Sequence, residues 1–280
     1  YLGSTVTMAS ESKIHLATNQ YSWLVYYQRE KKNFLENLDD GLQDIKKSGL
    51  DGLETMINSP QDVEHFSKNL KQHGLEMRSI YVNSTLHEQD QADKSIDQVV
   101  AIAEKAVEAG TKIIVTNPSP ISWSGEKSKS DAELIIQAKA LNRLGEKLSE
   151  IGITLSYHNH APELQNAARE FHHMMVGTDP DYVTLCLDAH WIYRGSGNSQ
   201  VALFDIIELY GSRITELHLR QSHEGTWSEA FGPGDIDYQR LAQHIRQIGI
   251  EPHFVLEQAV EQGTPHTMGP VEAHQHLSLI

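Results

Sequence analysis

Four side chains that can bind a metal or move a proton follow apolar runs along the chain. They are His158, Asp188, His218 and Glu257, and the runs before them are 152–157, 183–187, 214–217 and 252–256. Polar side chains at the end of a buried strand are costly unless a ligand or a partner uses them. An interval of about 30 residues, which separates the first three, is the length of one strand–helix unit. The sequence therefore predicts that the four lie at the same height on successive parallel strands.

The chemistry of this set is that of a divalent-metal site. Two carboxylates that converge in a pocket of low dielectric constant repel each other, and a cation removes that repulsion. Two imidazoles with two carboxylates suit Mn²⁺, Co²⁺, Fe²⁺ or Zn²⁺ better than Ca²⁺. Taken singly, each residue also has an ordinary explanation as a hydrogen-bonded neighbour, a helix N-cap or an ion-pair partner. The joint pattern favours one bound cation, Mn²⁺ first, with Co²⁺, Zn²⁺, Fe²⁺ or Mg²⁺ as alternatives.

Two kinds of element alternate along the chain and position these side chains. Apolar, β-branched runs predict strands at 13–17, 50–55, 75–82, 112–116, 152–157, 182–187, 213–219 and 253–256. Helical periodicity predicts helices at 34–48, 62–73, 95–109, 131–150, 164–175, 200–210, 238–248 and 269–279. An aromatic loop with Tyr21, Trp23, Tyr26 and Tyr27 is expected after the first strand.

The alternation runs without a linker and predicts a single-domain α/β fold, a (β/α)8 TIM barrel over residues 13–280. In such a barrel the active site lies at the carboxyl ends of the strands. A doubly wound open sheet is the alternative, but the Gly-rich phosphate turn typical of it is missing after the first strand. Residues 1–12 are polar and aperiodic, and we interpret them as a disordered tag or leader remnant outside the barrel.

The composition excludes several classes of protein. The net charge of −15 on 280 residues, with no basic face to offset it, excludes a nucleic acid as partner. No stretch approaches the ~20 apolar residues of a membrane span. The single cysteine, Cys186, excludes an internal disulfide and is expected in the core. We expect a cytoplasmic protein, with a cleaved export leader as the alternative.

Five short motifs carry a resemblance to a known family. They are Tyr157-His158-Asn159-His160, Leu187-Asp188 with Trp191, His218-Leu219, the run Gly-Pro-Gly-Asp-Ile-Asp-Tyr at 232–238, and Leu256-Glu257. With them the chain resembles the xylose isomerase-like TIM barrel superfamily, in its sugar phosphate isomerase/epimerase branch, over nearly its whole length from residue 13. The resemblance implies one divalent metal held by the four strand ends. Its members include ketose 3-epimerases, inosose dehydratases and the endonuclease IV group.

Two departures from these relatives narrow the expected chemistry. Ketose 3-epimerases carry a glutamate that ligates metal and moves a proton at the position of His158. A metal-bound histidine is a poor proton shuttle, so we expect one dominant base here. Endonuclease IV uses three metals and many more ligands, most of which this chain lacks. Together with the acidic charge, this discards a DNA-repair function.

Other residues around the metal also have expected roles, and among them Glu54 resembles a pocket glutamate of the family. The predicted catalytic residues are Glu257, His160, His190 and Glu54, and the predicted substrate-binding residues are Trp191, Arg194, Arg220 and Trp227. For Glu54 the alternative is a structural ion pair, and for His160 it is a contact that orients the metal ligands. The alternative for the tryptophans is packing, and for Arg194 and Arg220 it is a surface salt bridge. We interpret residues 222–234 as a lid over the site.

We expect a metal-dependent isomerase or epimerase, or a dehydratase, that acts on a keto-sugar or cyclitol through an enediolate. Its partner is a small-molecule sugar, and a homo-oligomer is left open. One alternative is a metal-dependent lyase or hydrolase of oxidised (3-keto) glycosides, with His223 or Glu229 as the acid for the leaving group. The other is a sugar-binding barrel without catalysis.

Overall fold

A computed structural model describes residues 14–275 of the chain. The expected tag or leader remnant at 1–12 lies outside these residues. Within the described part of the chain, no helix is both long and apolar enough to cross a membrane.

Eight parallel strands form a closed barrel in the order β1-β10-β7-β6-β5-β4-β3-β2. Their bounds are β1 (Leu16–Asn19), β2 (Gly52–Met56), β3 (Ser79–Tyr81), β4 (Ile113–Thr116), β5 (Thr154–His158), β6 (Val183–Asp188), β7 (Ile214–Leu219) and β10 (His253–Leu256). The first and last strands close the barrel, and Thr18 Oγ1 donates to the carbonyl oxygen of Leu256 at 2.8 Å. The predicted TIM barrel is confirmed, and closure excludes the open doubly wound sheet.

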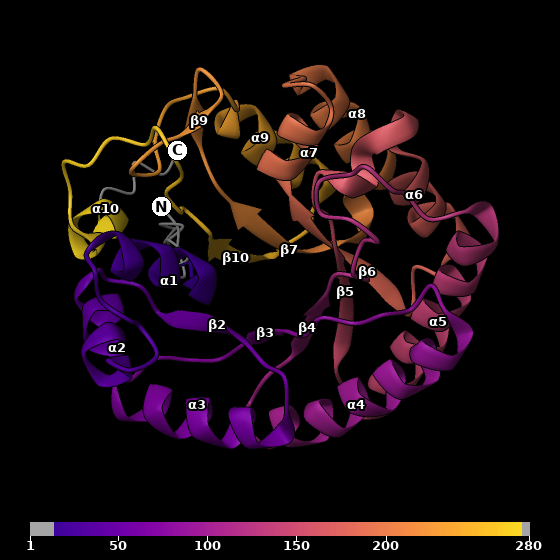
Figure 1. Ribbon diagram of the computed structural model, residues 1–280, viewed down its shortest axis with the longest axis horizontal. Helices are drawn as coiled ribbons and strands as arrows, with labels where there is room; N and C mark the ends of the chain where they lie inside the picture. The colour runs from indigo at the N-terminus through magenta and orange to yellow at the C-terminus, as the bar shows by residue number, and fades with distance from the viewer. Residues whose placement is uncertain (1–13, 276–280) are drawn as a thin grey trace, which may run out of the picture.

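Helices surround the barrel as an outer ring (Figure 1). They are α1 (Gln20–Arg29), α2 (Leu38–Lys47), α3 (Pro60–Gln72), α4 (Gln89–Glu108), α5 (Asp131–Glu150), α6 (Gln165–Gly177), α7 (Ala189–Gly195), α8 (Gln200–Tyr210), α9 (Tyr238–Ile248) and α10 (Pro270–Gln275). Capping boxes at Ser59 and Ser130 start α3 and α5. The apolar faces of the outer helices pack on the strands, and the main core lies between the helix layer and the barrel.

The predicted aromatic loop is wrong, because these residues form α1. Asn19 caps the helix by accepting a hydrogen bond from the backbone N–H of Tyr21 at 2.7 Å. Trp23, Tyr26 and Tyr27 are buried at spacings of three and four residues, which is one face of a helix. Aromatic residues have modest intrinsic helix propensity, so burial of this face decides the local structure.

Several other predicted bounds change, among them those of β3 and α4. The predicted strand at 75–82 is shorter, since β3 covers only Ser79–Tyr81. The predicted helix at 95–109 begins earlier, at Gln89, because its first turns are mostly polar and carry little apolar periodicity.

Strand register brings the predicted metal ligands to one end of the barrel. His158 and Asp188 are the last residues of β5 and β6, and Glu257 directly follows β10. Asp188 pairs in register with His218 across β6 and β7. All strands are parallel, so these positions share the carboxyl end of the barrel.

The β6–β7 ladder shifts register just before this end. Leu185 faces Ile214, whereas the next residue, Cys186, faces Glu216. Thr215 is therefore an extra residue on β7, as in a β-bulge. Bulges commonly redirect side chains beside active sites, and this one sets the level of Glu216 in the barrel.

Candidate active site

The four predicted ligands meet in one cluster, with one donor atom from each within 4.8 Å of the others. His158 Nε2 lies 3.1 Å from His218 Nδ1, and the same Nδ1 lies 2.8 Å from Glu257 Oε2. Asp188 Oδ2 lies 3.8 Å from His158 Nε2. Donor atoms that each sit about 2.1 Å from one cation lie roughly 3 to 3.5 Å from each other, so these separations suit a single metal ion.

Asp188 gives a further sign that the cluster fits a cation. Its Oδ1 accepts a hydrogen bond from the backbone N–H of Trp191 at 2.8 Å and so caps α7. Its Oδ2 is fully buried and has no hydrogen-bond partner among the described residues. Burial raises the pKa of Asp188 to about 7, because the lost hydration outweighs the lowering by the charges of Arg220 and His218 and by the Trp191 hydrogen bond. A divalent cation would supply that compensation.

Glu257 is held by two positive neighbours. Its Oε1 lies 2.5 Å from Arg220 Nη2, and its Oε2 lies beside His218 Nδ1. Burial alone would raise the pKa of Glu257, but the Arg220 charge and the hydrogen bond from His218 lower it to about 2. Glu257 is therefore a carboxylate at neutral pH.

Arg220 is fully buried and fixed beside the cluster. Its Nε donates to the carbonyl oxygen of Glu257 at 2.9 Å. The guanidinium carbon lies 4.1 Å from the ring centroid of Trp227 and 5.3 Å from that of Trp191. Arg220 Nη1 has no hydrogen-bond partner among the described residues. Three predicted substrate-binding residues, Arg220, Trp191 and Trp227, thus pack together in one cation–π cluster at the barrel mouth.

His160 lies against the metal cluster. Its ring centroid is 4.6 Å from that of His158 and 5.8 Å from that of Trp191. Its backbone N–H donates to Glu163 Oε2 at 2.8 Å. Burial lowers the pKa of His160 to about 4, so the ring is neutral at pH 7.

His190 lies on the aromatic side of the site. Its ring is 5.8 Å from the ring of Trp191 and 6.0 Å from that of Trp227, both edge to face. Neither ring nitrogen has a hydrogen-bond partner among residues 14–275. Burial lowers the pKa of His190 to about 2. A neutral imidazole with both nitrogens open can donate to or accept from a substrate hydroxyl.

Comparison with known proteins places this arrangement in a family. The sequence profile described as "Xylose isomerase-like TIM barrel" matches residues 42–277. The chain belongs to this family. The resemblance inferred from the motifs is thereby confirmed.

Relatives of this xylose isomerase-like barrel include an inosose dehydratase from Clostridium perfringens (strain 13 / Type A). It is 24% identical over 244 residues, which cover 77% of this chain and 80% of the relative.

Solved structures share the fold. A sugar phosphate isomerase/epimerase from Parabacteroides distasonis ATCC 8503 superposes with a TM-score of 0.74 at 18% identity, covering 98% of this chain and 96% of the other. A xylose isomerase-like TIM barrel protein from Mycobacterium smegmatis in complex with magnesium gives 0.70 at 14% identity, covering 96% and 97%.

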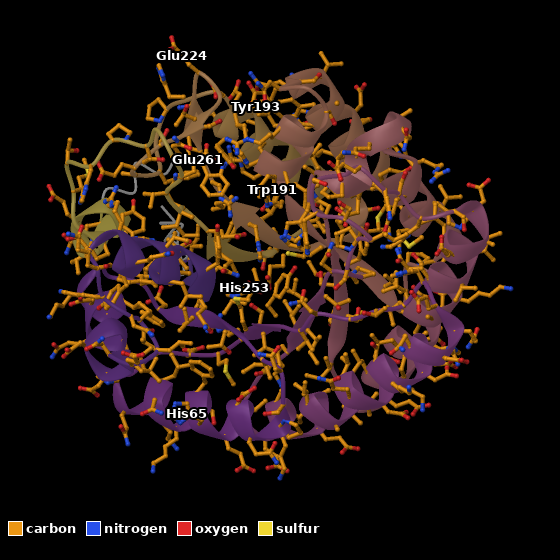
Figure 2. All side chains as sticks on the ribbon, in the orientation of Figure 1. His65, Trp191, Tyr193, Glu224, His253 and Glu261 are labelled. Atoms are coloured by element: carbon orange, nitrogen blue, oxygen red, sulfur yellow. The ribbon has the colours of Figure 1, made fainter. Side chains whose placement is uncertain are left out.

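The predicted lid of this xylose isomerase-like barrel contains a short hairpin, β8 (Ser222–His223) and β9 (Thr226–Trp227). Arg194 binds both carboxylate oxygens of Glu261, at 2.9 and 2.7 Å, and also donates to the carbonyl oxygen of Gly225. Glu261 Oε1 accepts from the backbone N–H of Trp227 at 2.8 Å. Figure 2 places Trp191 over the barrel interior and Glu261 towards the hairpin, while Glu224 lies at the outer rim. Arg194 thus fastens the hairpin, and its predicted contact with substrate stays a prediction.

Glu229, the proposed acid of the lyase or hydrolase alternative, has another role. Its carboxylate pairs with Arg29 at 2.8 Å and accepts from the backbone N–H groups of Thr267 and Met268 at 3.0 Å. Burial alone would raise the pKa of Glu229, but these hydrogen bonds lower it. An ionised carboxylate that is fully engaged has no proton to donate to a leaving group. The other candidate acid, His223, is exposed on the hairpin.

Glu54, a predicted catalytic residue, lies on the opposite side of His218 from the cluster. Its Oε1 is 3.2 Å from His218 Nε2 and accepts from Asn19 Nδ2 at 2.5 Å. Burial would raise the pKa of Glu54, but the charge of His218 and the hydrogen bonds lower it. The contact with His218 corresponds to the ion-pair alternative, and a role on substrate hydroxyls stays a prediction.

Two fully or nearly buried side chains beside the cluster were missed by sequence reasoning. Glu216 Oε1 lies 3.1 Å from His218 Nε2, and burial together with the Glu54 charge raises the pKa of Glu216 to about 8. The ring of Tyr81 lies edge to face on that of His158, at 5.5 Å. The sequence signal for Glu216 was its position two residues before His218, which puts both side chains on the same face of the strand.

Proposed function

We propose that this chain is a divalent-metal-dependent enzyme that acts on a keto-sugar or cyclitol. It removes the proton next to the carbonyl, and the resulting enediolate leads to isomerisation, epimerisation or loss of water. The observation that carries the proposal is the cluster of four donor side chains within 4.8 Å at the barrel mouth. The relatives add support, since they are a dehydratase of inosose and a sugar phosphate isomerase/epimerase, and a third family member binds magnesium.

The metal would be held by His158, Asp188, His218 and Glu257, whose donor atoms are two imidazole nitrogens and two carboxylate oxygens. When bound, the cation supplies Lewis acidity that polarises a carbonyl oxygen and favours charge development on it. The mixed N/O donor set suits Mn²⁺, Co²⁺, Fe²⁺ or Zn²⁺, and Mg²⁺ remains an alternative.

The remaining side chains hold and enclose the sugar. Arg220 Nη1, which has no partner in the described part of the chain, donates to a substrate oxygen. Because both tryptophan rings pack against it, the guanidinium is already oriented before substrate arrives. Trp191 and Trp227 present apolar ring surface to the sugar, and the hairpin that carries Trp227 excludes water from the mouth.

Three side chains remain candidates for the base that takes the proton. Glu257 is ionised, but both of its oxygens contact positive groups. His160 and His190 are neutral and have open ring nitrogens. A negative charge that develops on the substrate next to either ring favours its protonated form, so each ring can accept a proton in the reaction.

The residue at the end of β5 bears on the outcome of the reaction. His158 stands where ketose 3-epimerases have a glutamate, so this site lacks a second carboxylate for the opposite face of the substrate. One dominant base delivers and removes protons on a single face. Isomerisation or dehydration is therefore favoured over two-base epimerisation.

The experiment is turnover of a panel of keto-sugars and keto-cyclitols by Mn²⁺-reconstituted protein in deuterated water, followed by NMR. For isomerisation or epimerisation we expect deuterium at the carbon next to the carbonyl, or exchange there before product forms. For loss of water, which leaves that carbon without hydrogen, we expect deuterium at the carbon that lost its hydroxyl group. Turnover with no label at either carbon and no exchange would exclude the enediolate route. Binding of these compounds without any turnover would instead support a sugar-binding barrel.

A further inference from the structure

Two buried carboxyl groups lie behind His218, on the side away from the metal cluster. Glu54 comes from β2 and Glu216 from β7, and both side chains are fully buried. Their Oε1 atoms lie 3.2 and 3.1 Å from His218 Nε2. A single imidazole nitrogen therefore faces two carboxyl groups in the interior of the barrel.

The other nitrogen of the same ring faces the opposite way. His218 Nδ1 lies 2.8 Å from Glu257 Oε2 and 3.1 Å from His158 Nε2. A neutral imidazole has one N–H and one lone pair. Both nitrogens face carboxylate oxygens, and a cation held by the four donors would take the place of the proton between Nδ1 and Glu257. The oxygens at Nε2 then keep the remaining proton there, and the lone pair of Nδ1 points to the donor cluster.

The two carboxyl groups are themselves held in place. Glu54 Oε1 accepts a hydrogen bond from Asn19 Nδ2 at 2.5 Å, and Glu216 Oε1 lies 3.7 Å from the thiol sulfur of Cys186. The register shift between β6 and β7 sets Glu216 opposite Cys186 and so fixes its height below His218. These contacts leave the carboxyl groups little freedom to move away from His218.

His158, the other histidine of the metal cluster, differs in what its remote ring nitrogen contacts. His158 Nδ1 has no hydrogen-bond partner within residues 14–275. Negative charge is therefore placed behind only one of the two histidines. An ordinary packing requirement gives no reason for this asymmetry, because both rings are equally buried.

We propose that Glu54 and Glu216 are positioning residues that fix the orientation and tautomer of His218 and make Nδ1 its metal-binding atom. This inference rests on the metal centre proposed above. Carboxylates that accept the remote N–H of a metal-bound histidine orient the ring and increase its basicity, and losing such partners typically costs about 10- to 100-fold in metal affinity. Glu54 acts through His218 and does not touch the substrate.

The test compares Co²⁺ affinity in the wild type, Glu54→Gln, Glu216→Gln and the double variant. Glutamine keeps the size of each side chain and removes the carboxyl group, and with it the charge that Glu54 carries. Affinity is measured by competition with a chelator, using the visible absorption of bound Co²⁺. The control is Glu170→Gln, which removes a buried carboxylate paired with Lys129 at 2.6 Å outside the cluster.

Each single variant keeps one carboxylate behind His218 and should lose less than tenfold in affinity. The double variant should lose about 10- to 100-fold, whereas Glu170→Gln should bind as the wild type does. Circular dichroism checks that the fold is retained. A double variant that binds Co²⁺ as tightly as the wild type overturns the inference and leaves the proposed function standing.

A second measurement needs no variant of the two carboxyl groups. Long-range ¹H–¹⁵N correlation of histidine-labelled, Zn²⁺-loaded protein identifies which nitrogen of His218 carries the proton, with His218→Asn used for assignment. We expect the proton on Nε2, and a proton on Nδ1 overturns the inference even if the double variant does not fold. A wild type that takes up no metal at all overturns the proposed function and this inference together.

Discussion

At the scale of single residues, Asp188 has a different task for each carboxylate oxygen. Oδ1 caps α7, and Oδ2 is the buried oxygen without a partner. Asp188→Asn keeps an acceptor for the cap but removes the charge. We expect metal content, measured by elemental analysis, to fall from about one ion per chain to near zero, with thermal stability almost unchanged. Full metal content in the variant would contradict the ligand assignment.

Two substitutions at His158 test whether this residue is a metal ligand. His158→Glu restores the carboxylate of the ketose 3-epimerases and should still bind metal, whereas His158→Ala leaves the cluster one donor short. We expect the alanine variant to bind Co²⁺ at least tenfold more weakly than the glutamate variant. Equal affinity in the two variants would remove His158 from the donor set.

Candidate metal ligands can be predicted from the sequence when they directly follow an apolar run. His158, Asp188 and Glu257 stand out because each is a polar interruption after such a run, and the structure brings them together. Glu216 was missed because it lies inside a strand and not at its end, although its spacing of two from His218 puts both side chains on one face. Its level in the barrel depends on the β6–β7 register shift, which only the assembled barrel defines.

At the scale of elements, the hairpin over the site depends on one bidentate ion pair. Arg194→Met removes the contacts to Glu261 and Gly225 that hold the hairpin. We expect kcat to fall several-fold and iodide quenching of Trp227 fluorescence to rise, with metal content unchanged. Arg246→Met, an exposed change on α9, serves as control. Quenching equal to that of the control would show that the ion pair does not hold the hairpin.

Element prediction succeeded where apolar periodicity was strong and failed where tertiary contacts decide. The β5, β6, β7 and β10 strands and most outer helices follow from the sequence pattern. Helix α1 does not, since its aromatic face becomes favourable only when it packs on the barrel and on α10. The Arg194–Glu261 pair joins residues 67 positions apart, and nothing local in the sequence links them.

At the scale of the whole molecule, buried neutral histidines make stability depend on pH. His274 is fully buried, stacks on Trp23 at 4.6 Å, and burial lowers its pKa from 6.5 to about 4. Between these values the unfolded chain binds more protons, so the free energy of unfolding falls as pH falls. At about 1.4 kcal/mol per pH unit, this residue removes about 2 kcal/mol between pH 6.5 and 5.

His274→Phe keeps the stacked ring and removes the titration. Urea unfolding at pH 7 and pH 5 should show a smaller loss of stability in the variant than in the wild type. An equal loss in both proteins would mean that His274 does not contribute to the acid sensitivity.

The closure of the barrel between β1 and β10 has a consequence for the order of events during folding. Thr18 and Leu256 are joined by a hydrogen bond across 238 positions of sequence, and contacts of such separation form late because the loop entropy must be overcome first. Glu257 directly follows this last strand. A refolding chain therefore lacks one of the four metal-donor side chains until β1 and β10 pair and close the barrel. The time course of Co²⁺ uptake should therefore report when the barrel closes. In stopped-flow refolding, its absorption should rise after the helical signal has reached its plateau, and a partly folded intermediate should remain colourless.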